Sequence, residues 1–492
     1  MDVDPIHTEP IPEQPQQRSQ SREDPTLVVD QVNRIADVLS THPNLRLPDY
    51  HPRELSPDPL SLDYSALAML SRANTAEPYE PKTYNEAISN SMQRMQWELA
   101  MDDEYKSLMD NKTWYLTTLP QGRTALRGKW VYALKRGPDG KVVRYKARWV
   151  VCGFEQREGL DYNETFASVV KPMSYKAILA IAAAMDWDLE QMDVKTAFLY
   201  GEVEEEIYVE QPTGYGKGNE GKVCRLNKAL YGLKQSPRVW YNTFASFIKT
   251  IGFEPLDADS SVFIDAPSGT IVALYVDDLL ITGPNKQDIQ RVKDALNSHF
   301  HMTDLGPCCY WLGMSITRNR QQRVLRLGQR AYVEKIVRDF GLWECKTTAT
   351  PMEASSHLET APGDFQANAL DRQTYQRAVG SLMYAMLGTR PDIAFPVSAV
   401  SRYASNPTQA HWGAVQRIIR YLRTTIDYQL TFQGTLESLT GYTDSDWVGD
   451  RDTRRSTLGF IFHLGSGLIS WQSKRQPIVA LSTCEAEYIG QT

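Results

Sequence analysis

The chain has 492 residues, 42% of them hydrophobic, and is too long for one ordinary domain. Its formal net charge of −7 excludes a uniformly basic protein that coats nucleic acid, so any phosphate-binding surface must be local. The six cysteines show no CxxC spacing, which argues against zinc and a disulfide framework and favours a reducing, intracellular compartment. No apolar run reaches the ~18 residues of a membrane span, so we expect no membrane partner.

The first 80 residues differ in composition from the rest. They contain eleven of the 27 prolines and fourteen acidic residues but no lysine. Such a segment cannot bury enough apolar surface to offset the entropy of ordering the chain. We therefore predict a disordered, acidic, proline-rich linker over residues 1–80, with one short helix-like patch at residues 28–39.

A folded unit is expected from residue 81, beginning with two helices between residues 84 and 108. Two strands at 128–135 and 142–151 flank the sequence Gly-Pro-Asp-Gly at 137–140, a strong hairpin turn signal. Nine Lys or Arg and one acidic residue lie between residues 121 and 150. This hairpin is therefore the main candidate for binding phosphate, although a basic run is also typical of an ordinary solvated face.

An alanine-rich helix is expected over 174–185, followed by a strand that carries Asp193 and a proline-terminated strand at 207–212. A further helix is predicted to begin with Ser236 as N-cap and Pro237 as its first residue. The sequence Lys-Gln-Ser-Pro-Arg at 234–238 offers amide donors, a positive dipole end and two cations to phosphate. A capped helix without a ligand is the plain alternative, and both interpretations can hold together.

Two adjacent carboxylates, Asp277 and Asp278, lie between the apolar runs 271–274 and 279–282, which have strand length. Asp is common in turns, so an exposed turn would explain this pair taken alone. Asp193 supplies a third carboxylate at another strand end, and unpaired buried carboxylates are costly. Three carboxylates at neighbouring strand ends would suit two divalent cations, with Mg²⁺ expected and Mn²⁺ as the alternative.

Downstream, we predict helices at 286–300, 329–340, 375–387 and 412–423, a turn and strand over 302–316, and a polar connector at 347–371. His411 has no metal partner at ligand spacing, so we expect a structural role. From residue 439 the pattern changes to three strands, at 439–444, 459–464 and 468–471, and a helix that starts near 482. We expect Asp446 and Asp450 at the surface.

Five motifs occur in an order that resembles one known family. They are DVKTAFL (193–199), YGLKQSPRVWY (231–241), YVDD (275–278), RPDI (390–393) and STCEAEY (482–488). Together they resemble the reverse transcriptase of copia-type LTR retrotransposons, over roughly residues 81–492. One short motif would be weak support, whereas five in the same order are specific.

The resemblance implies an α/β fold, with an α+β palm, built as a right-hand polymerase. Fingers and palm would occupy residues 81–300, and thumb and connection residues 301–437. An incomplete ribonuclease H-like domain would follow at 438–492.

The resemblance also implies the roles of single residues. Asp193 and Asp277 would be the principal catalytic metal ligands, and Asp278 would contribute less directly because alternate strand residues face opposite sides. Nucleotide or template contacts are implied at Lys146, Arg148, Phe198, Tyr275 and Gln235. Arg148 and Lys146 would hold the triphosphate, while Phe198 would exclude a 2′-hydroxyl. From composition alone, Phe198 is an ordinary core residue and the two cations belong to an exposed basic hairpin.

The C-terminal segment resembles the start of a copia-type ribonuclease H. Asp444 on the first strand and Glu487 on the first helix would be metal ligands. Spacing alone does not separate Glu487 from Glu485, although Glu485 is the weaker candidate. The chain stops at Thr492, before the further metal-binding residues that this fold needs, so we expect no ribonuclease H activity from it.

The expected function is RNA-directed DNA synthesis in the cell, in cytoplasmic virus-like particles and in the nucleus. The implied partners are an RNA template, a DNA primer, dNTPs and other Pol products such as integrase, which would link the chain to DNA integration. A rival interpretation is a non-catalytic transposon remnant or a domesticated nucleic-acid-binding protein. The intact carboxylates argue against that rival, and the missing ligands argue against a plain metal-dependent nuclease.

Overall fold

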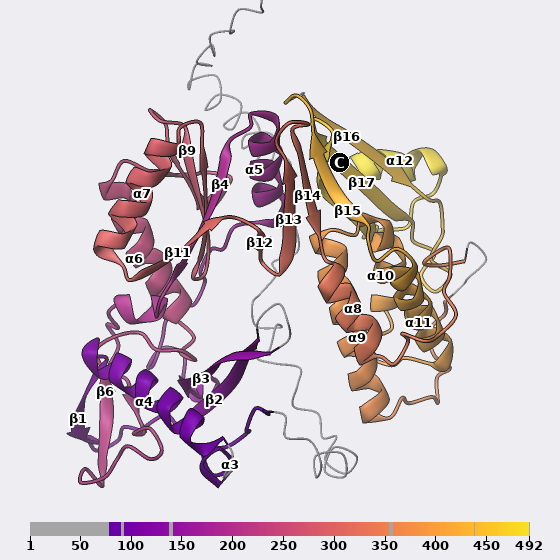
Figure 1. Ribbon diagram of the computed structural model, residues 1–492. Coiled ribbons are helices and arrows are strands. Elements are labelled where there is room, and N and C mark those ends of the chain that lie inside the picture. Colours follow the sequence, from indigo (N-terminus) through magenta and orange to yellow (C-terminus); the bar gives the residue numbers. More distant parts are fainter. Residues whose placement is uncertain (1–77, 90–92, 137–140, 354–357, 437, 492) are drawn as a thin grey trace, which may run out of the picture.

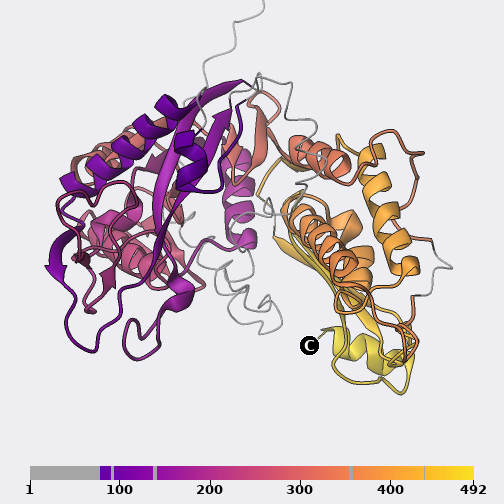
Figure 2. The ribbon, with the colours of Figure 1, turned by 90° about the horizontal axis from the view of Figure 1, so that it is seen from below.

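The computed structural model describes residues 78–89, 93–136, 141–353, 358–436 and 438–491. The predicted linker through residue 77, its helix-like patch and the turn at 137–140 lie outside these ranges. Figures 1 and 2 show two lobes, one built from the indigo, magenta and pink elements and the other mainly from the orange to yellow elements, with helix α5 (Pro172–Ala184) between them. None of the described helices combines the length and apolarity needed to cross a bilayer.

The central sheet has six antiparallel strands in the order β11-β4-β10-β9-β8-β7. These strands are β4 (Asp188–Val194), β7 (Glu254–Leu256), β8 (Asp259–Asp265), β9 (Thr270–Tyr275), β10 (Asp278–Gly283) and β11 (Met302–Pro307). Helices α6 (Ser236–Thr250) and α7 (Lys286–His299) cover one face, and α5 covers the other. Because both faces are buried, β9 and β10 are almost continuously apolar rather than alternating.

A second layer in the same lobe carries the predicted basic hairpin. It consists of α3 (Tyr84–Ser89), α4 (Arg94–Asp110), the hairpin β2 (Gly128–Arg136) and β3 (Val142–Val151), and a sheet β1-β6-β5. The strands of that sheet are β1 (Trp114–Thr118), β5 (Tyr208–Val209) and β6 (Lys222–Leu226). Its core contains the buried rings of Trp97, Trp130 and Trp149. Both predicted helices and the two hairpin strands are confirmed.

The other lobe joins a four-stranded sheet to a group of helices. The strands are β12 (Tyr310–Trp311), β13 (Met314–Asn319), β14 (Val324–Gly328) and β15 (Gln429–Gln433). The helices are α8 (Arg330–Asp339), α9 (Ala369–Gly388), α10 (Ala394–Ser401) and α11 (Gln409–Thr424). His411 is structural, as predicted, because it forms a capping box with Thr408 at the start of α11. Residues 302–316, predicted as a turn and a strand, instead form β11, which pairs with β4, then β12 and the start of β13.

The C-terminal sheet contains β16 (Leu439–Ser445), β17 (Thr457–Leu464) and β18 (Gly467–Arg475), followed by α12 (Thr483–Gln491). It shares a core with the central sheet, because Leu464, Ile469 and Trp471 pack in the cluster that contains α5. The indole Nε1 of Trp471 donates to the Met386 carbonyl at 3.1 Å. The three predicted strands and the helix are confirmed.

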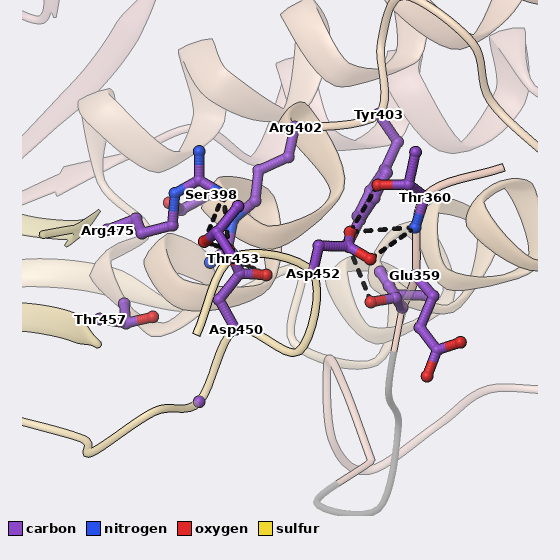
Figure 3. Close-up of polar contacts among 12 residues, drawn as sticks. Glu359, Thr360, Ser398, Arg402, Tyr403, Asp450, Asp452, Thr453, Thr457 and Arg475 are labelled. Atoms are coloured by element: carbon purple, nitrogen blue, oxygen red, sulfur yellow. Dashed lines mark hydrogen bonds and ion pairs between the residues drawn. The ribbon is translucent and has the colours of Figure 1, made fainter. Parts of the chain in front are cut away.

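The prediction that Asp450 lies at the surface was wrong, although Asp446 is exposed as expected. Asp450 is only 3% exposed. Its carboxylate oxygens lie 2.6 Å from Arg475 and 3.4 Å from Arg402, as Figure 3 shows. Beside it, Asp452 accepts hydrogen bonds from the connector at Thr360 and from Tyr403 after α10 (Figure 3). These partners are distant in sequence, so no local pattern indicates the burial.

Candidate active site

Three carboxylates gather at one end of the central sheet. Asp278 is the first residue of β10 and lies directly opposite Asp193 in the ladder that joins β10 to β4. Residues opposite each other in an antiparallel pair have Cβ atoms about 4.5–5.5 Å apart. Asp277 occupies the two-residue turn between β9 and β10. The cross-strand neighbour of Asp193 is therefore Asp278, whereas Asp277 reaches the site from the turn.

The turn that carries Asp277 has an unusual backbone. Val276 has a φ of 55°, a conformation that β-branched residues rarely adopt. A positive φ at the first residue of a two-residue turn matches the twist of the two strands. The Trp240 Nε1 donates to the Val276 carbonyl at 2.6 Å, and the Val194 amide donates to the Asp277 carbonyl at 2.9 Å. Helix α6 and strand β4 thus hold the strained turn in place.

Burial and neighbouring negative charge raise the pKa of two of these carboxylates, Asp278 and Asp193. The pKa of Asp278 is raised to about 6, first by burial and then by the charges of Asp277 and Asp193, while a hydrogen bond from Gln191 opposes the shift. Burial and Asp277 also raise the pKa of Asp193, although the cations of the basic hairpin lower it. Each shift disfavours the ionised form, so the group favours a bound proton or a cation.

The basic hairpin acts on this acidic group. Lys146 and Arg148 lie two residues apart on β3 and therefore share a face, and both contribute to the pKa of Asp193. The pKa of Lys146 is itself lowered, first by burial and then by the neighbouring cations, of which Arg148 has the largest effect. The hairpin thus places several neighbouring cations close enough to the acidic group to lower the pKa of Asp193.

Arg148 is held by an aromatic stack. Its guanidinium carbon lies 4.1 Å from the centroid of the Tyr231 ring, within the range of a cation–π contact. The Tyr231 ring lies 4.6 Å from the ring of Phe198, in the 3₁₀ turn η3 (Ala197–Tyr200). Phe198 is 8% exposed, so the structure places most of its ring in the core. The sequence reasoning did not single out Tyr231, although it opens one of the five motifs.

Gln235 has its side chain inside the protein, where it is 2% exposed. Its amide nitrogen donates to the Asp161 carbonyl at 2.9 Å, and its amide oxygen accepts from Gln156 at 3.0 Å. The predicted N-cap was wrong by one residue, because Gln235 precedes the first helical residue, Ser236. The Ser236 hydroxyl donates instead to the Leu230 carbonyl, which removes it from the capping role.

The acidic group fits divalent cations in charge and in ligand type, since it offers only oxygen ligands that repel one another. Within the described residues, no three His, Cys, Asp or Glu side chains already converge on a metal position. The Asp278 carboxylate accepts a hydrogen bond from Gln191 at 3.4 Å.

The second predicted acidic pair lies in the C-terminal sheet. Asp444 is exposed on β16, and the Glu487 carboxylate on α12 accepts from the amide of the next strand residue, Ser445, at 3.4 Å. Glu485 instead accepts from the Leu481 amide at 2.6 Å, and its own amide donates to Ser482. Because the Glu485 carboxylate is hydrogen-bonded at the start of α12, the geometry favours Glu487 as the partner of Asp444.

Comparisons with known proteins agree with the motifs. Residues 111–354 match the family described as reverse transcriptase (RNA-dependent DNA polymerase). The chain is 46% identical over 422 residues to the retrovirus-related Pol polyprotein from transposon TNT 1-94 of Nicotiana tabacum, covering 84% of this chain and 32% of that protein. It is 34% identical over 305 residues to a transposon Ty5-1 protein of Saccharomyces cerevisiae, covering 61% of this chain and 97% of the relative.

A further relative is the retrovirus-related Pol polyprotein from transposon RE2 of Arabidopsis thaliana, 38% identical over 414 residues, with 83% of this chain and 28% of that protein covered. The chain spans about a third or less of the two Pol polyproteins. Acidic strand ends beneath a basic hairpin in a mixed α/β fold place the molecule in the polymerase class. The chain belongs to the reverse transcriptase family, in the form found in copia-type transposon Pol polyproteins.

Proposed function

We propose that the chain catalyses template-directed DNA synthesis by extending a primer on an RNA or DNA template. The observation that carries this proposal is the position of Asp278 opposite Asp193, beside Asp277 and within electrostatic reach of Lys146 and Arg148. In the proposed right-hand arrangement, the hairpin β2–β3 belongs to the fingers and the central sheet to the palm. Helices α8 to α11 and their sheet would form the thumb and connection.

The basic hairpin would bind the incoming nucleotide. Arg148 presents a planar group of donors that suits phosphate oxygens, and its stack on Tyr231 fixes the plane of that group. Lys146 adds a second cation on the same face. Phe198 packs against Tyr231 and is proposed to lie under the sugar, where it would exclude a 2′-hydroxyl. Tyr275 and Gln235 would position substrate and template, Gln235 through the loop that it holds.

Asp193, Asp277 and Asp278 would hold two divalent ions, Mg²⁺ or alternatively Mn²⁺. Bound there, such ions lower the pKa of the primer 3′-hydroxyl and neutralise charge on the leaving pyrophosphate. The chain itself contributes the fixed turn at Val276, which sets the position of Asp277, and the Gln191 hydrogen bond, which orients Asp278. The relatives' names suggest a wider context, so we propose that the chain works beside other Pol products, including integrase, in cytoplasmic particles and the nucleus.

For the C-terminal sheet we propose ion binding without nuclease activity. Asp444 and Glu487 would hold one divalent cation, because Glu487 reaches the strand next to Asp444. Among the described residues no third acidic or histidine side chain joins this pair. Incubating the purified chain with an RNA–DNA hybrid and Mg²⁺ tests this directly, and hybrid degradation above background would contradict it.

Primer extension tests the proposed polymerase. The purified chain is given an RNA template, a DNA primer, dNTPs and Mg²⁺, with and without EDTA, and template binding is measured in parallel. We expect extension that EDTA abolishes. Template binding without any extension would support the rival interpretation, a nucleic-acid-binding transposon remnant.

A further inference from the structure

One loop connects the basic hairpin to the helix behind the central sheet. It spans residues 152–171, between β3 and α5. Just before the loop, the amide of Val151, the last residue of β3, donates to the Tyr231 carbonyl at 2.8 Å. Near the end of the loop, the Val170 amide donates at 3.0 Å to the carbonyl of Leu274, in the strand that leads to the turn with Asp277. The loop therefore begins beside Tyr231, on which Arg148 stacks, and ends beside the strand that leads to the proposed active-site turn.

In this loop, two apolar side chains are exposed and two polar side chains are buried. Phe154 is 75% exposed and Phe166 is 71% exposed, although phenylalanine is usually buried. The polar residues Gln156 and Asp161 of the same loop are only 5% and 7% exposed. A loop that buries its amide and carboxylate while exposing two phenyl rings keeps those rings available for a ligand.

Hydrogen bonds and close backbone packing hold the part of the loop that carries Phe154. The Gln156 side-chain nitrogen donates to the Gln235 oxygen at 3.0 Å, and its oxygen accepts from the Lys234 amide at 2.8 Å. Backbone packing adds to this network, since a Cβ on Gly153 would lie 2.0 Å from the Gly232 carbonyl oxygen. Only glycine permits that approach, so the loop is docked on the segment that leads into α6.

Arginine side chains lie beside both phenylalanines. Arg238 donates to the Phe166 carbonyl at 3.4 Å and pairs with Glu164. Arg127 pairs with Glu155, the residue after Phe154. The side chains of Arg127 and Arg238 are 64% and 37% exposed, so both guanidinium groups can reach phosphate oxygens.

We propose that Phe154 and Phe166 are stacking platforms for the unpaired template bases that enter ahead of the primer terminus. This inference rests on the proposed polymerase function. Every base has a π face, so stacking on phenyl rings tolerates any template sequence, as template-directed synthesis requires. Arg127 and Arg238 contact the phosphates on either side of the stacked bases.

The proposal is tested by comparing the binding of template–primer duplexes that differ only in a single-stranded template overhang. Duplexes with and without a 5′ template overhang are titrated against the full chain, with 2-aminopurine in the overhang to report stacking. We expect Phe154→Ala and Phe166→Ala each to weaken overhang binding about tenfold and to reduce the 2-aminopurine quenching. Binding of the blunt duplex should stay unchanged. Phe154→Trp should retain the quenching, while Phe154→Leu should behave like the alanine variant because it lacks a π face.

Phe395→Ala, which removes another exposed ring at 48% exposure on α10, is the matched control and should leave both duplexes unaffected. Equal weakening on blunt and overhanging duplexes, full quenching in the leucine variant or unchanged binding in both alanine variants would each overturn the inference. The last outcome would favour a protein partner for the loop. If the wild-type chain extends no primer but shows the phenylalanine-dependent quenching, the polymerase proposal fails and the stacking assignment stands.

Discussion

Three residues at the end of the central sheet carry carboxylates whose negative charges repel one another. Asp193 and Asp278 face each other across two strands, and Asp277 adds a third negative charge. The same residues would be poor choices for stability alone, because like charges directly opposite each other destabilise a sheet. Functional sites are where such local conflicts are expected.

Asp278 gives a pH-dependent stability prediction. Its pKa in the folded chain is raised to about 6, so the native state binds more protons than the unfolded state between the two pKa values. Its contribution to stability is therefore fully present below about pH 4 and is lost as pH rises through about 6. Asp278→Asn mimics the protonated form, so above about pH 7 it should be more stable than wild type by about 1 kcal/mol, after allowance for partial exposure.

Urea unfolding at both ends of this pH range, without added metal, measures the effect. Near pH 4 the variant and the wild type should have similar stability. A variant that is less stable than wild type at the higher pH would show that Asp278 is not strained by its neighbours.

Arg148 gives a prediction about nucleotide binding. In Arg148→Lys the charge remains, but the planar group that stacks on Tyr231 is lost. The KM for dNTPs should rise about tenfold, which corresponds to about 1.4 kcal/mol, while kcat changes little. Steady-state primer extension measures both constants. Lys129→Arg on the paired strand β2 is the control and should alter neither, whereas an unchanged KM in Arg148→Lys would remove Arg148 from the triphosphate site.

Several residue assignments followed from sequence, and others did not. His411 was predicted as structural because it lacked a partner at metal spacing, and its capping box confirms this. The burial of Asp450 was missed because Arg402 and Arg475 are brought to it only by the tertiary fold. Spacing left Glu485 and Glu487 unresolved, and only the folded start of α12 shows that Glu485 accepts from the Leu481 amide whereas Glu487 accepts from the Ser445 amide.

At the scale of elements, the pattern of apolar residues predicted those strands and helices whose own residues show a clear apolar run or a helical spacing. The strands β9 and β10 and the helices α7 and α8 were predicted from runs and helical spacing. The strands β1 and β6 were missed because they pair across more than a hundred residues of chain. The same holds for β14 and β15, whose register is set by a partner that local patterns do not reveal.

The strained turn between β9 and β10 gives a prediction at this scale. Trp240→Phe removes the hydrogen bond to the Val276 carbonyl while keeping most of the buried ring. The free energy of unfolding should fall by about 1–2 kcal/mol, and primer extension should slow because Asp277 is less well fixed. Trp311→Phe is a matched control, since Trp311 is fully buried and its Nε1 has no hydrogen-bond partner among the described residues. Equal rates of extension for both variants would mean that the turn does not depend on α6.

At the scale of the whole molecule, the two lobes meet in a buried core around α5, and Lys176 forms one junction within it. Lys176 of α5 is 2% exposed, and burial lowers its pKa well below the usual value. Its ammonium nitrogen donates to the Leu387 carbonyl at 2.7 Å and lies 3.8 Å from the centroid of the Trp471 ring. Lys176 thus links the helix behind the central sheet to the end of α9 and to strand β18.

Trp471→Ala tests whether this junction couples the lobes. The substitution removes a buried ring and the hydrogen bond to Met386, so stability should fall by about 3–5 kcal/mol. If the lobes are coupled, near-ultraviolet circular dichroism and primer extension should be lost together on heating. Two separate transitions, with extension surviving the first, would show that the C-terminal sheet folds independently of the central sheet.

The five motifs were sufficient to predict the family, because each motif carries its own local signature. They did not predict that the C-terminal sheet packs on α5, since Lys176 and Trp471 lie in none of them. Contacts between lobes depend on side chains nearly three hundred residues apart. Such contacts follow from the assembled fold rather than from local pattern.

The central claim is that the three carboxylates at the end of the central sheet form the nucleotidyl-transfer centre. The most direct measurement is single-nucleotide incorporation by Asp277→Asn on an RNA template, with template affinity determined on the same samples. Asp257→Asn, an exposed acid in the turn between β7 and β8, is the matched control. We expect Asp277→Asn to lose at least about 10³-fold in rate while binding template normally, and the control to retain full activity. Incorporation by Asp277→Asn at the rate of the control would show that Asp277 is not part of a nucleotidyl-transfer centre.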